Sequence, residues 1–436
     1  MKGDVNRMEE KQHREPVILH CDCNGFFASV ECLLNPALKG VPMAVTGDPE
    51  IRHGIILAKN ELAKAYGIKT AETIWQAKKK CRDLVCVPAH HDEYHRISEM
   101  VNRIYLDYTD LVDPFGIDES FLDVTGSLRF FGMSPRELAD TIRNRVHSEI
   151  GITISVGVSF CRAFAKLGSD YKKPDATTVI DRSNYKEIAW PLPVSDLLYA
   201  GKKTSEALRR IGIHTIGELA ACDCETVGRI LGESGIGLWR YARGLDDAPV
   251  RSFYDREEVK SVGNGMTFRR DISGEDEILS GVSALADSVA ARLRTEGKKC
   301  TVVQVQIKDP SFRTLQKQRT LRHATWLKQE LSETAVALIR EAYGFTRPIR
   351  ALTITAASLI PHDEAYEQLD MFGEAKENEK QEHLEDALAG IRRKFGTGSI
   401  HLGAYENKDI GVSLYKSEKP RKKFTESKFS DFDEDL

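Results

Sequence analysis

The sequence lacks the features that mark several common classes of protein. Its nine cysteines form no Cys-x-x-Cys pair and no cysteine–histidine spacing of a structural zinc site. No apolar segment has the length of a membrane span, and the polar stretch Met1–Glu15 does not resemble a secretory signal peptide. We find no internal repeat. These absences argue against a zinc finger, a disulfide-stapled secreted domain and a membrane protein, and they predict a cytoplasmic protein.

Neither sign of charge dominates. The chain has 436 residues, with 62 lysines and arginines against 66 aspartates and glutamates, and a net charge of −4. No overall field therefore draws it onto nucleic acid, and any such contact must come from local clusters. A composition of 41% hydrophobic and 29% charged residues is typical of a folded globular protein. The length predicts about two to four domains.

Acidic residues stand where two apolar runs end. Asp118 and Glu119 follow the run 111–117, and Asp22 follows the run 16–21. Removing neighbouring carboxylates from water costs on the order of several kcal/mol unless cations neutralise them. Oxygen ligands on adjacent strands suit a hard divalent ion such as Mg²⁺. An isolated Asp-Glu pair could equally be an exposed loop end, so the interpretation depends on what surrounds Asp22.

Apolar periodicity predicts an α/β first part of the chain. Strands are expected at about 16–22, 54–58, 120–124 and 152–158, and helices at about 59–66, 92–108 and 135–150. This order predicts an antiparallel sheet with helices on one face. Short, glycine-rich helices are expected at 190–248 and a mixed α+β part from about 253. An amphipathic helix is expected at about 377–395, before a tail that is expected to be disordered.

A cluster of positive charge lies on a predicted hairpin, 301–308 and 313–321. Between Arg292 and Lys328, a span that includes this hairpin, the chain has two acids and ten basic residues: Arg292, Arg294, Lys298, Lys299, Lys308, Arg313, Lys317, Arg319, Arg322 and Lys328. The strands alternate Gln/Lys with Val/Ile, which predicts one apolar face and one face of phosphate partners. The alternative is an ordinary solvated face.

The residues around Asp22 resemble the opening motif of the Y-family DNA polymerases: Asp22-Cys-Asn-Gly-Phe-Phe-Ala-Ser-Val-Glu31. Four further motifs of this family follow in order at 54–67, 116–125, 155–174 and 260–268. The resemblance covers about residues 16–360 and is strongest to the polymerase IV branch. Glu61, Lys64 and Gly116 depart from that branch, and the Asn-Glu-x-x-Lys pattern leans toward UmuC-like members.

The resemblance implies roles for individual residues. Asp22, Asp118 and Glu119 would be the catalytic carboxylates that hold two Mg²⁺ ions, with the backbone carbonyl of Cys23 as a further ligand. Phe27 would be the steric gate that excludes a 2′-hydroxyl, whereas Phe26 is better read as a core aromatic. The family also has cations that bind the triphosphate, and the resemblance places them at Lys64 and Lys173.

The resemblance also implies an α+β multidomain fold of the right-hand polymerase type. Its expected domains are a palm (16–27 and 90–180), fingers (28–89), a thumb with a helix-hairpin-helix (181–248), a little finger (253–362) and a C-terminal segment (363–436). DNA contacts are expected at Gly201, Lys202, Lys308, Arg313, Lys317 and Arg319. The 201–219 region could equally be a small helical packing module, because Tyr199 replaces the first turn glycine.

A pentapeptide in the C-terminal segment, Gln368-Leu369-Asp370-Met371-Phe372, resembles the peptide by which bacterial polymerases bind their sliding clamp. The helix after it is expected to be a packing element. The function implied is low-fidelity, translesion DNA synthesis by a monomer, with primer-template DNA, deoxyribonucleoside triphosphates and the clamp as partners. The alternatives are a UmuC-like polymerase, a non-catalytic clamp adaptor and a palm-type cyclase; the adaptor is disfavoured because all three acids are present.

Overall fold

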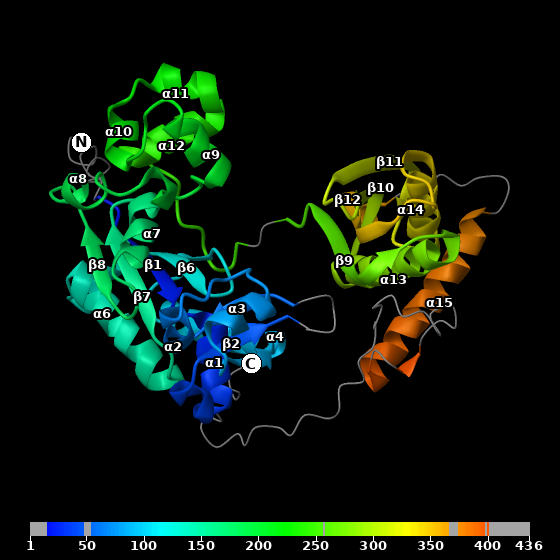
Figure 1. Cartoon of the computed structure of the whole chain (residues 1–436), viewed down its shortest axis with the longest axis horizontal. Coiled ribbons are helices and arrows are strands. Elements are labelled where there is room, and N and C mark those ends of the chain that lie inside the picture. The colour runs from blue at the N-terminus through cyan, green and yellow to red at the C-terminus, as the bar shows by residue number, and fades with distance from the viewer. Residues whose placement is uncertain (1–14, 48–53, 256–257, 366–373, 397–398, 401–436) are drawn as a thin grey trace, which may run out of the picture. The chain divides into compact units, whose positions relative to one another are not determined.

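The computed structural model describes residues 15–47, 54–255, 258–365, 374–396 and 399–400. The chain divides into two compact units, the first ending at Arg256 and the second beginning at Glu257 (Figure 1). No helix in the described part of the chain has both the length and the apolar character needed to span a bilayer.

A five-stranded sheet forms the centre of the first unit. Its order is β5-β6-β1-β7-β8. The strands are β1 (Ile18–Cys23), β5 (Val112–Pro114), β6 (Glu119–Asp123), β7 (Ile154–Ser159) and β8 (Thr177–Ile180). β1 pairs antiparallel with β6 and β7, and the register sets Asp22 directly opposite Glu119. Only β7 and β8 run parallel, so the predicted antiparallel sheet is confirmed except at that edge.

Helices cover both faces of this sheet. On the face that carries His20 and Asp22 lies α7 (Arg162–Tyr171), whereas α4 (His91–Leu106) and α6 (Pro135–Arg145) pack against the opposite face. A single turn of π-helix, η2 (Val146–Ile150), extends α6, and α5 (Ser127–Phe131) precedes it. The prediction of helices on one face is therefore wrong. All six residues of β1 and of β7 are buried, as expected for strands covered on two sides.

Helix α7 crosses β7 at very short range, and two glycines allow this. A Cβ atom on Gly157 would lie 1.9 Å from the carbonyl oxygen of Ala165, and one on Gly168 would lie 3.0 Å from the Cα of Gly157. The close crossing brings the side chains of α7 over the end of β1.

Replacing Gly157 by alanine is expected to destabilise the protein by about 1–3 kcal/mol or more, because the added methyl group meets backbone that cannot rotate away. Thermal or urea unfolding of the variant measures the effect. Gly126→Ala is the matched control, since a Cβ there meets no atom within 4 Å. Equal stability of the two variants would contradict the close crossing.

A second, three-stranded sheet lies between residues 28 and 89. It has the order β3-β2-β4, with β2 (Met43–Thr46), β3 (Ile56–Lys59) and β4 (Val85–Pro88). Helices α1 (Phe26–Leu34), α2 (Glu61–Ala65), α3 (Ile74–Lys80) and the 3₁₀ turn η1 (Pro36–Gly40) accompany it. The predicted strand-to-helix segment at 54–66 is confirmed as β3 followed by α2.

Short helices fill residues 185–242 and share one apolar core with α7. They are α8 (Tyr185–Ile188), η3 (Val194–Asp196), α9 (Lys202–Arg209), α10 (Ile216–Ala221), α11 (Cys224–Leu231) and α12 (Glu233–Ala242). Tyr199 has a φ of 66° and so adopts the left-handed conformation that glycine usually supplies in such a turn. The turn before α9 therefore forms without the expected glycine.

The second unit is a four-stranded antiparallel sheet backed by two helices. Its order is β11-β10-β12-β9. The elements are β9 (Ser261–Ile272), β10 (Lys298–Lys308), β11 (Thr314–Thr325), β12 (Ile349–Pro361), η4 (His362–Glu364), α13 (Glu275–Thr295) and α14 (Lys328–Ala342). The predicted hairpin is confirmed as β10 and β11. The helices bury Val303, Val305 and Ile307 on one face.

The basic residues of the hairpin do not all lie on the open face. Lys317 and Arg319 pair in register with Val305 and Val303, so they share the face that the helices cover. Arg319 contacts Glu341 of α14 at 2.6 Å. The predicted division into an apolar face and a face of phosphate partners is therefore wrong for these two residues. Between Val302 and Lys308 the open face instead carries Gln304 and Gln306, each paired with a glutamine of β11.

Helix α15 (Glu374–Phe395) packs on α13 and α14 within the second unit. Its contacts are charged: Glu385 lies 2.5 Å from Arg294, Glu382 lies 2.8 Å from Lys299, and Arg392 lies 3.0 Å from Asp287. The expected packing helix is confirmed. The tail from residue 401 onward lies outside the described residues.

Candidate active site and metal centre

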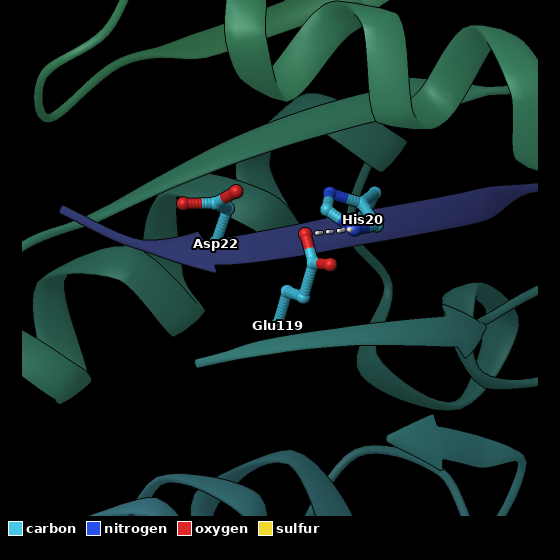
Figure 2. Close-up of side chains that lie close together, drawn as sticks. All are labelled: His20, Asp22 and Glu119. Carbon is cyan, nitrogen blue, oxygen red and sulfur yellow. Dashed lines mark ion pairs between the residues drawn. The ribbon is translucent and has the colours of Figure 1, made fainter. Parts of the chain in front are cut away.

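The predicted acids meet at the end of β1. Asp22 and His20 project from the same side of β1, because they are two residues apart on a strand, and Glu119 projects from β6 toward them (Figure 2). One ligand atom from each of these three residues lies within 4.8 Å of the others. Asp118 comes immediately before β6, and its backbone carbonyl accepts a hydrogen bond from the N–H of Cys23 at 2.9 Å.

Two lysines of the α7 region neutralise these acids. The Nζ of Lys166 lies 2.6 Å from Glu119 Oε2 and 3.1 Å from Asp22 Oδ2. The Nζ of Lys173 lies 2.7 Å from Asp22 Oδ2. Both lysines also contact Asp170 on α7, at 3.4 and 2.6 Å. The electrostatic requirement inferred from the sequence, that cations accompany the acids, is thus met by side chains of the chain itself.

The pKa values of the two adjacent acids are shifted in opposite directions. Burial raises the pKa of Asp118, and the charges of Asp22 and Glu119 raise it further. Burial acts in the same direction on Glu119, but its neighbours His20 and Lys166 outweigh it and hold the pKa of Glu119 at about 2. Asp118 is therefore the carboxylate that lacks a sufficient counter-charge in the metal-free protein.

His20 is a fully buried member of the cluster. Its Nδ1 lies 2.8 Å from Ser169 Oγ, and that hydroxyl donates to the backbone carbonyl of Lys166. Nε2 faces Glu119 Oε2 at 3.4 Å and makes no closer polar contact among the described residues. Burial lowers the pKa of His20, so the ring is neutral at neutral pH. The His20–Ser169 contact ties β1 to α7.

The donor set fits a hard divalent cation. Asp22 and Glu119 offer carboxylate oxygens from paired strands, the partly buried Asp118 adds a third carboxylate, and the unpartnered Nε2 of His20 points toward Glu119. Mg²⁺ binds such oxygens and keeps positions for water and phosphate. These residues can hold the group that the sequence implied.

Phe27 stacks on a firmly held aromatic ring. Its ring centroid lies 4.1 Å from that of Tyr94, with an interplanar angle of 12°. The Tyr94 hydroxyl donates to Glu31 Oε1 at 2.5 Å, and Glu31, only 3% exposed, also contacts Nδ1 of His90 at 2.8 Å. A buried carboxylate thus fixes the support of the ring. Phe26 is 2% exposed and belongs to the core, as predicted.

The two predicted triphosphate cations differ in position. Lys173 belongs to the acid cluster, whereas Lys64 lies on α2 with its Nζ 3.3 Å from Glu61 and its side chain 57% exposed. A cavity of about 320 Å³ lies beside Asn24, Gly25 and Pro174, and it is Lys59, not Lys64, that lines it. The structure therefore brings Lys173 to the acids and does not bring Lys64 to this cavity.

The predicted DNA contacts lie in both units. Gly201 and Lys202 are exposed at the start of α9, where the N–H of Gly201 bonds the carbonyl of Tyr199 at 3.0 Å. Lys308 ends β10, and Arg313 is exposed in the turn that follows. The predicted clamp peptide, Gln368 to Phe372, lies outside the described residues.

Sequence reasoning missed Lys166 and His20, although both carry a signal. His20 stands two residues before Asp22, so strand alternation places both on one face. Lys166, Asp170 and Lys173 are spaced at helical intervals of four and three residues, which indicates one charged side of α7 and its C-terminal extension.

Carboxylates on adjacent strands, with lysines beside them on a crossing helix, are the groups with which phosphoryl-transfer enzymes hold metal ions and phosphates. Residues 21–170 match the model of the impB/mucB/samB family, and residues 259–371 match that of its C-terminal domain. The chain belongs to the Y-family DNA polymerases, in the group of DNA polymerase IV.

Named relatives agree with this membership. DNA polymerase IV of Acetivibrio thermocellus is 42% identical, over 89% of this chain and 96% of the relative. DNA polymerase IV 1 of Bacillus subtilis is 37% identical, over 92% of this chain and 96% of the relative. A solved Y-family polymerase chimera, Dbh-Dpo4(243-245)-Dbh, shares the fold with a TM-score of 0.69 and 20% identity, over 79% of this chain and 99% of that chain. The predicted α+β polymerase fold is confirmed.

Proposed function

We propose that this polymerase adds deoxyribonucleotides to a DNA primer, with low fidelity and across damaged templates, and that Asp22, Asp118 and Glu119 hold two magnesium ions. The observation that carries the assignment of the site is the register of β1 and β6, which sets Asp22 opposite Glu119 at the end of a buried sheet. An adaptor without catalysis would not need three carboxylates there.

In this proposal the residues of the chain bind and orient the metal ions and the triphosphate. Two Mg²⁺ ions, when bound, neutralise the triphosphate and favour ionisation of the primer 3′-hydroxyl. Asp22 and Glu119 face each other across the β1–β6 pairing, the lowered pKa of Glu119 keeps that carboxylate ionised, and the Cys23 carbonyl is proposed as a further ligand. Lys173 can exchange its contact with Asp22 for a contact with a phosphate oxygen. Lys64 remains a proposed triphosphate contact, which requires it to leave Glu61.

We propose the domain boundaries that the family resemblance implies. We assign the five-stranded sheet to the palm (16–27 and 90–180), the three-stranded sheet to the fingers (28–89), the short helices to the thumb (181–248) and the second unit to the little finger (253–362). In the thumb, Gly201 and Lys202 stand at the exposed start of α9, where the backbone N–H of Lys202 is proposed to contact a DNA phosphate, since the N–H of Gly201 already bonds Tyr199. In the little finger, Lys308 lies half-buried on the open face of the hairpin, Arg313 and Lys317 are exposed, and Arg319, which is paired with Glu341, is the weakest of the four proposals.

Primer extension tests the proposal. The full-length protein is given a primed template, undamaged or with a single lesion, together with Mg²⁺ and deoxyribonucleoside triphosphates. We expect extension on both templates and none after chelation of the metal. A protein that binds the primer-template but never extends it would refute the assignment.

We further propose that the enzyme acts as a monomer in the cytoplasm. The relatives named DNA polymerase IV favour that group over the UmuC-like alternative.

We propose that residues Gln368 to Phe372 bind the sliding clamp as an extended peptide, with Leu369, Met371 and Phe372 in an apolar pocket. Tethering raises the effective concentration of the enzyme at the primer end without new DNA contacts.

Deleting Gln368–Phe372 is expected to leave synthesis without clamp unchanged and to remove its stimulation by clamp, a loss on the order of tenfold or more. Extension of a primed circular template with and without loaded clamp measures this. The matched control is Asp370→Ala, which keeps the three apolar anchors. Stimulation that survives the deletion would show that the clamp binds elsewhere.

A further inference from the structure

The ammonium group of Lys166 occupies the oxygens that a metal ion would need. It lies 2.6 Å from Glu119 Oε2 and 3.1 Å from Asp22 Oδ2. A carboxylate oxygen that binds Mg²⁺ lies about 2.0–2.1 Å from the ion. In a partly buried site, an ammonium and a divalent ion on the same oxygens repel each other strongly. Lys166 must therefore leave these oxygens when an ion binds.

A second carboxylate stands ready to receive it. Asp170 lies one turn further along α7, and its Oδ2 is 3.4 Å from the Nζ of Lys166. The side chain of Asp170 is 46% exposed, whereas those of Asp22 and Glu119 are 11% and 19% exposed. Asp170 is therefore at the edge of the cluster and on the solvent side of the predicted metal ligands.

We propose that Lys166 is an exchangeable internal counter-ion: it neutralises Asp22 and Glu119 in the metal-free protein and moves to Asp170 when metal binds. Metal binding is then an exchange of cations rather than the filling of a bare acidic site. The inference rests on the proposed role of Asp22 and Glu119 as metal ligands.

The exchange requires no movement of the main chain. The backbone carbonyl of Lys166 accepts a hydrogen bond from Ser169 Oγ at 2.8 Å, and Ser169 contacts His20 of β1 at 2.8 Å. These contacts hold α7 on the sheet while the lysine side chain rotates about its own bonds. Burial acts to lower the pKa of Lys166, but the charges of Asp22, Asp170 and Glu119 outweigh it, so the side chain remains charged.

The exchange also accounts for the pairing of acids and lysines in this region. Lys173 contacts both Asp22 and Asp170, at 2.7 and 2.6 Å, so Asp170 already bridges the two lysines. When Lys166 moves toward Asp170, Lys173 loses part of that contact and is freed for another anion. Departure of one lysine thus prepares the other to meet a phosphate.

To test the proposal, the full-length protein, freed of metal by chelation, is titrated with Mn²⁺ in a calorimeter, without DNA or nucleotide. The thermal midpoint of each variant in chelator is measured in parallel. The variants are Lys166→Met, Asp170→Asn, the double variant, and Lys172→Met as the matched control, since Lys172 is an exposed lysine of the same segment. Lys166→Gln replaces Lys166→Met should the latter fail to fold.

Lys166→Met is expected to bind Mn²⁺ on the order of tenfold more tightly and to lower the midpoint in chelator, because the competing cation is gone. Asp170→Asn is expected to weaken binding by roughly threefold or more, because the displaced lysine has no partner. In the double variant the effect of Asp170→Asn should shrink to the part that acts through Lys173, a non-additivity that independent charges do not produce. Lys172→Met should leave both quantities unchanged.

Two results would overturn the exchange. One is Mn²⁺ affinity in Lys166→Met no higher than in the wild type. The other is an effect of Asp170→Asn that persists undiminished in the double variant. Failure of the metal site itself looks different: the wild type would then bind no Mn²⁺, or would bind it as well after Asp22→Asn as before.

Discussion

Replacing Asp118 or Glu119 by alanine is expected to abolish primer extension and to leave DNA binding intact. Each residue offers a carboxylate at the end of the palm sheet, beside Asp22. A metal ligand at such a site supports several kcal/mol of transition-state stabilisation, which corresponds to a loss of about 10³-fold or more in rate. Single-turnover extension measures the rate, and a filter or anisotropy assay measures DNA binding.

The two acids should differ in their effect on stability, which separates a functional loss from misfolding. The folded-state pKa of Asp118 is raised, so its ionised form costs stability above that pKa, and Asp118→Asn should stabilise the metal-free protein at neutral pH. The folded-state pKa of Glu119 is depressed to about 2, so its charge contributes stability above its ordinary pKa. Glu119→Gln should therefore destabilise the protein at neutral pH, and this difference should fade as pH falls toward 2.

Asp110→Ala is the matched control, because Asp110 is an exposed acid of the same region. Full activity of both Asp118→Ala and Glu119→Ala would rule out the metal-site assignment. Loss of activity in Asp118→Asn together with lower stability would instead point to a structural role.

Phe27→Ala is expected to admit ribonucleotides. A flat ring against the sugar leaves no room for a 2′-hydroxyl, and its removal should reduce the preference for deoxyribonucleotides on the order of 100-fold. The ring is held in place by its stack on Tyr94, which Glu31 anchors from the core. The ratio of kcat/KM for deoxy- and ribonucleoside triphosphates measures the discrimination, and incorporation of the deoxyribonucleotide should change little.

Phe130→Ala is the control for this truncation, since the ring of Phe130 is 85% exposed and lies on α5. An unchanged sugar preference in Phe27→Ala would refute the gate. A loss of deoxyribonucleotide incorporation equal to the gain for ribonucleotides would show that Phe27 orients the sugar in general.

The sequence predicts the site residues whose positions follow from local patterns in the chain. Asp22 and the pair Asp118–Glu119 end apolar runs, and strand pairing follows from those runs, so their meeting could be predicted. The spacing of Lys166 indicates a charged side of α7 but not that this side meets the acids, because its contact with Glu119 depends on α7 crossing β7 at the distance that Gly157 permits. That crossing is a tertiary event that no local periodicity encodes.

The face of the sheet on which a side chain lies was harder to predict than the pairing of the strands. The hairpin of β10 and β11 forms where the alternation of Gln and Val indicated it, yet Lys317 and Arg319 lie on the helix-covered side. On an edge strand a long cationic side chain can lie beside an apolar face while its head reaches an acid, as Arg319 does with Glu341. The small sheet of β2, β3 and β4 was also missed in part, because strands of four residues carry little periodic signal.

The pleat of β1 separates its two thiols from the carboxylate between them. Cys21 and Cys23 flank Asp22, but successive residues of a strand point to opposite faces, so both sulfurs lie in the core with α4 and α6. Burial raises the pKa of Cys21 to about 12 and that of Cys23 well above its ordinary value, so both remain thiols at neutral pH. The donor atoms on the other face are carboxylate oxygens and the ring nitrogen of His20. A strand that holds two sulfurs beside the proposed metal ligand Asp22 therefore keeps them out of that site and shields them from thiol-directed reagents.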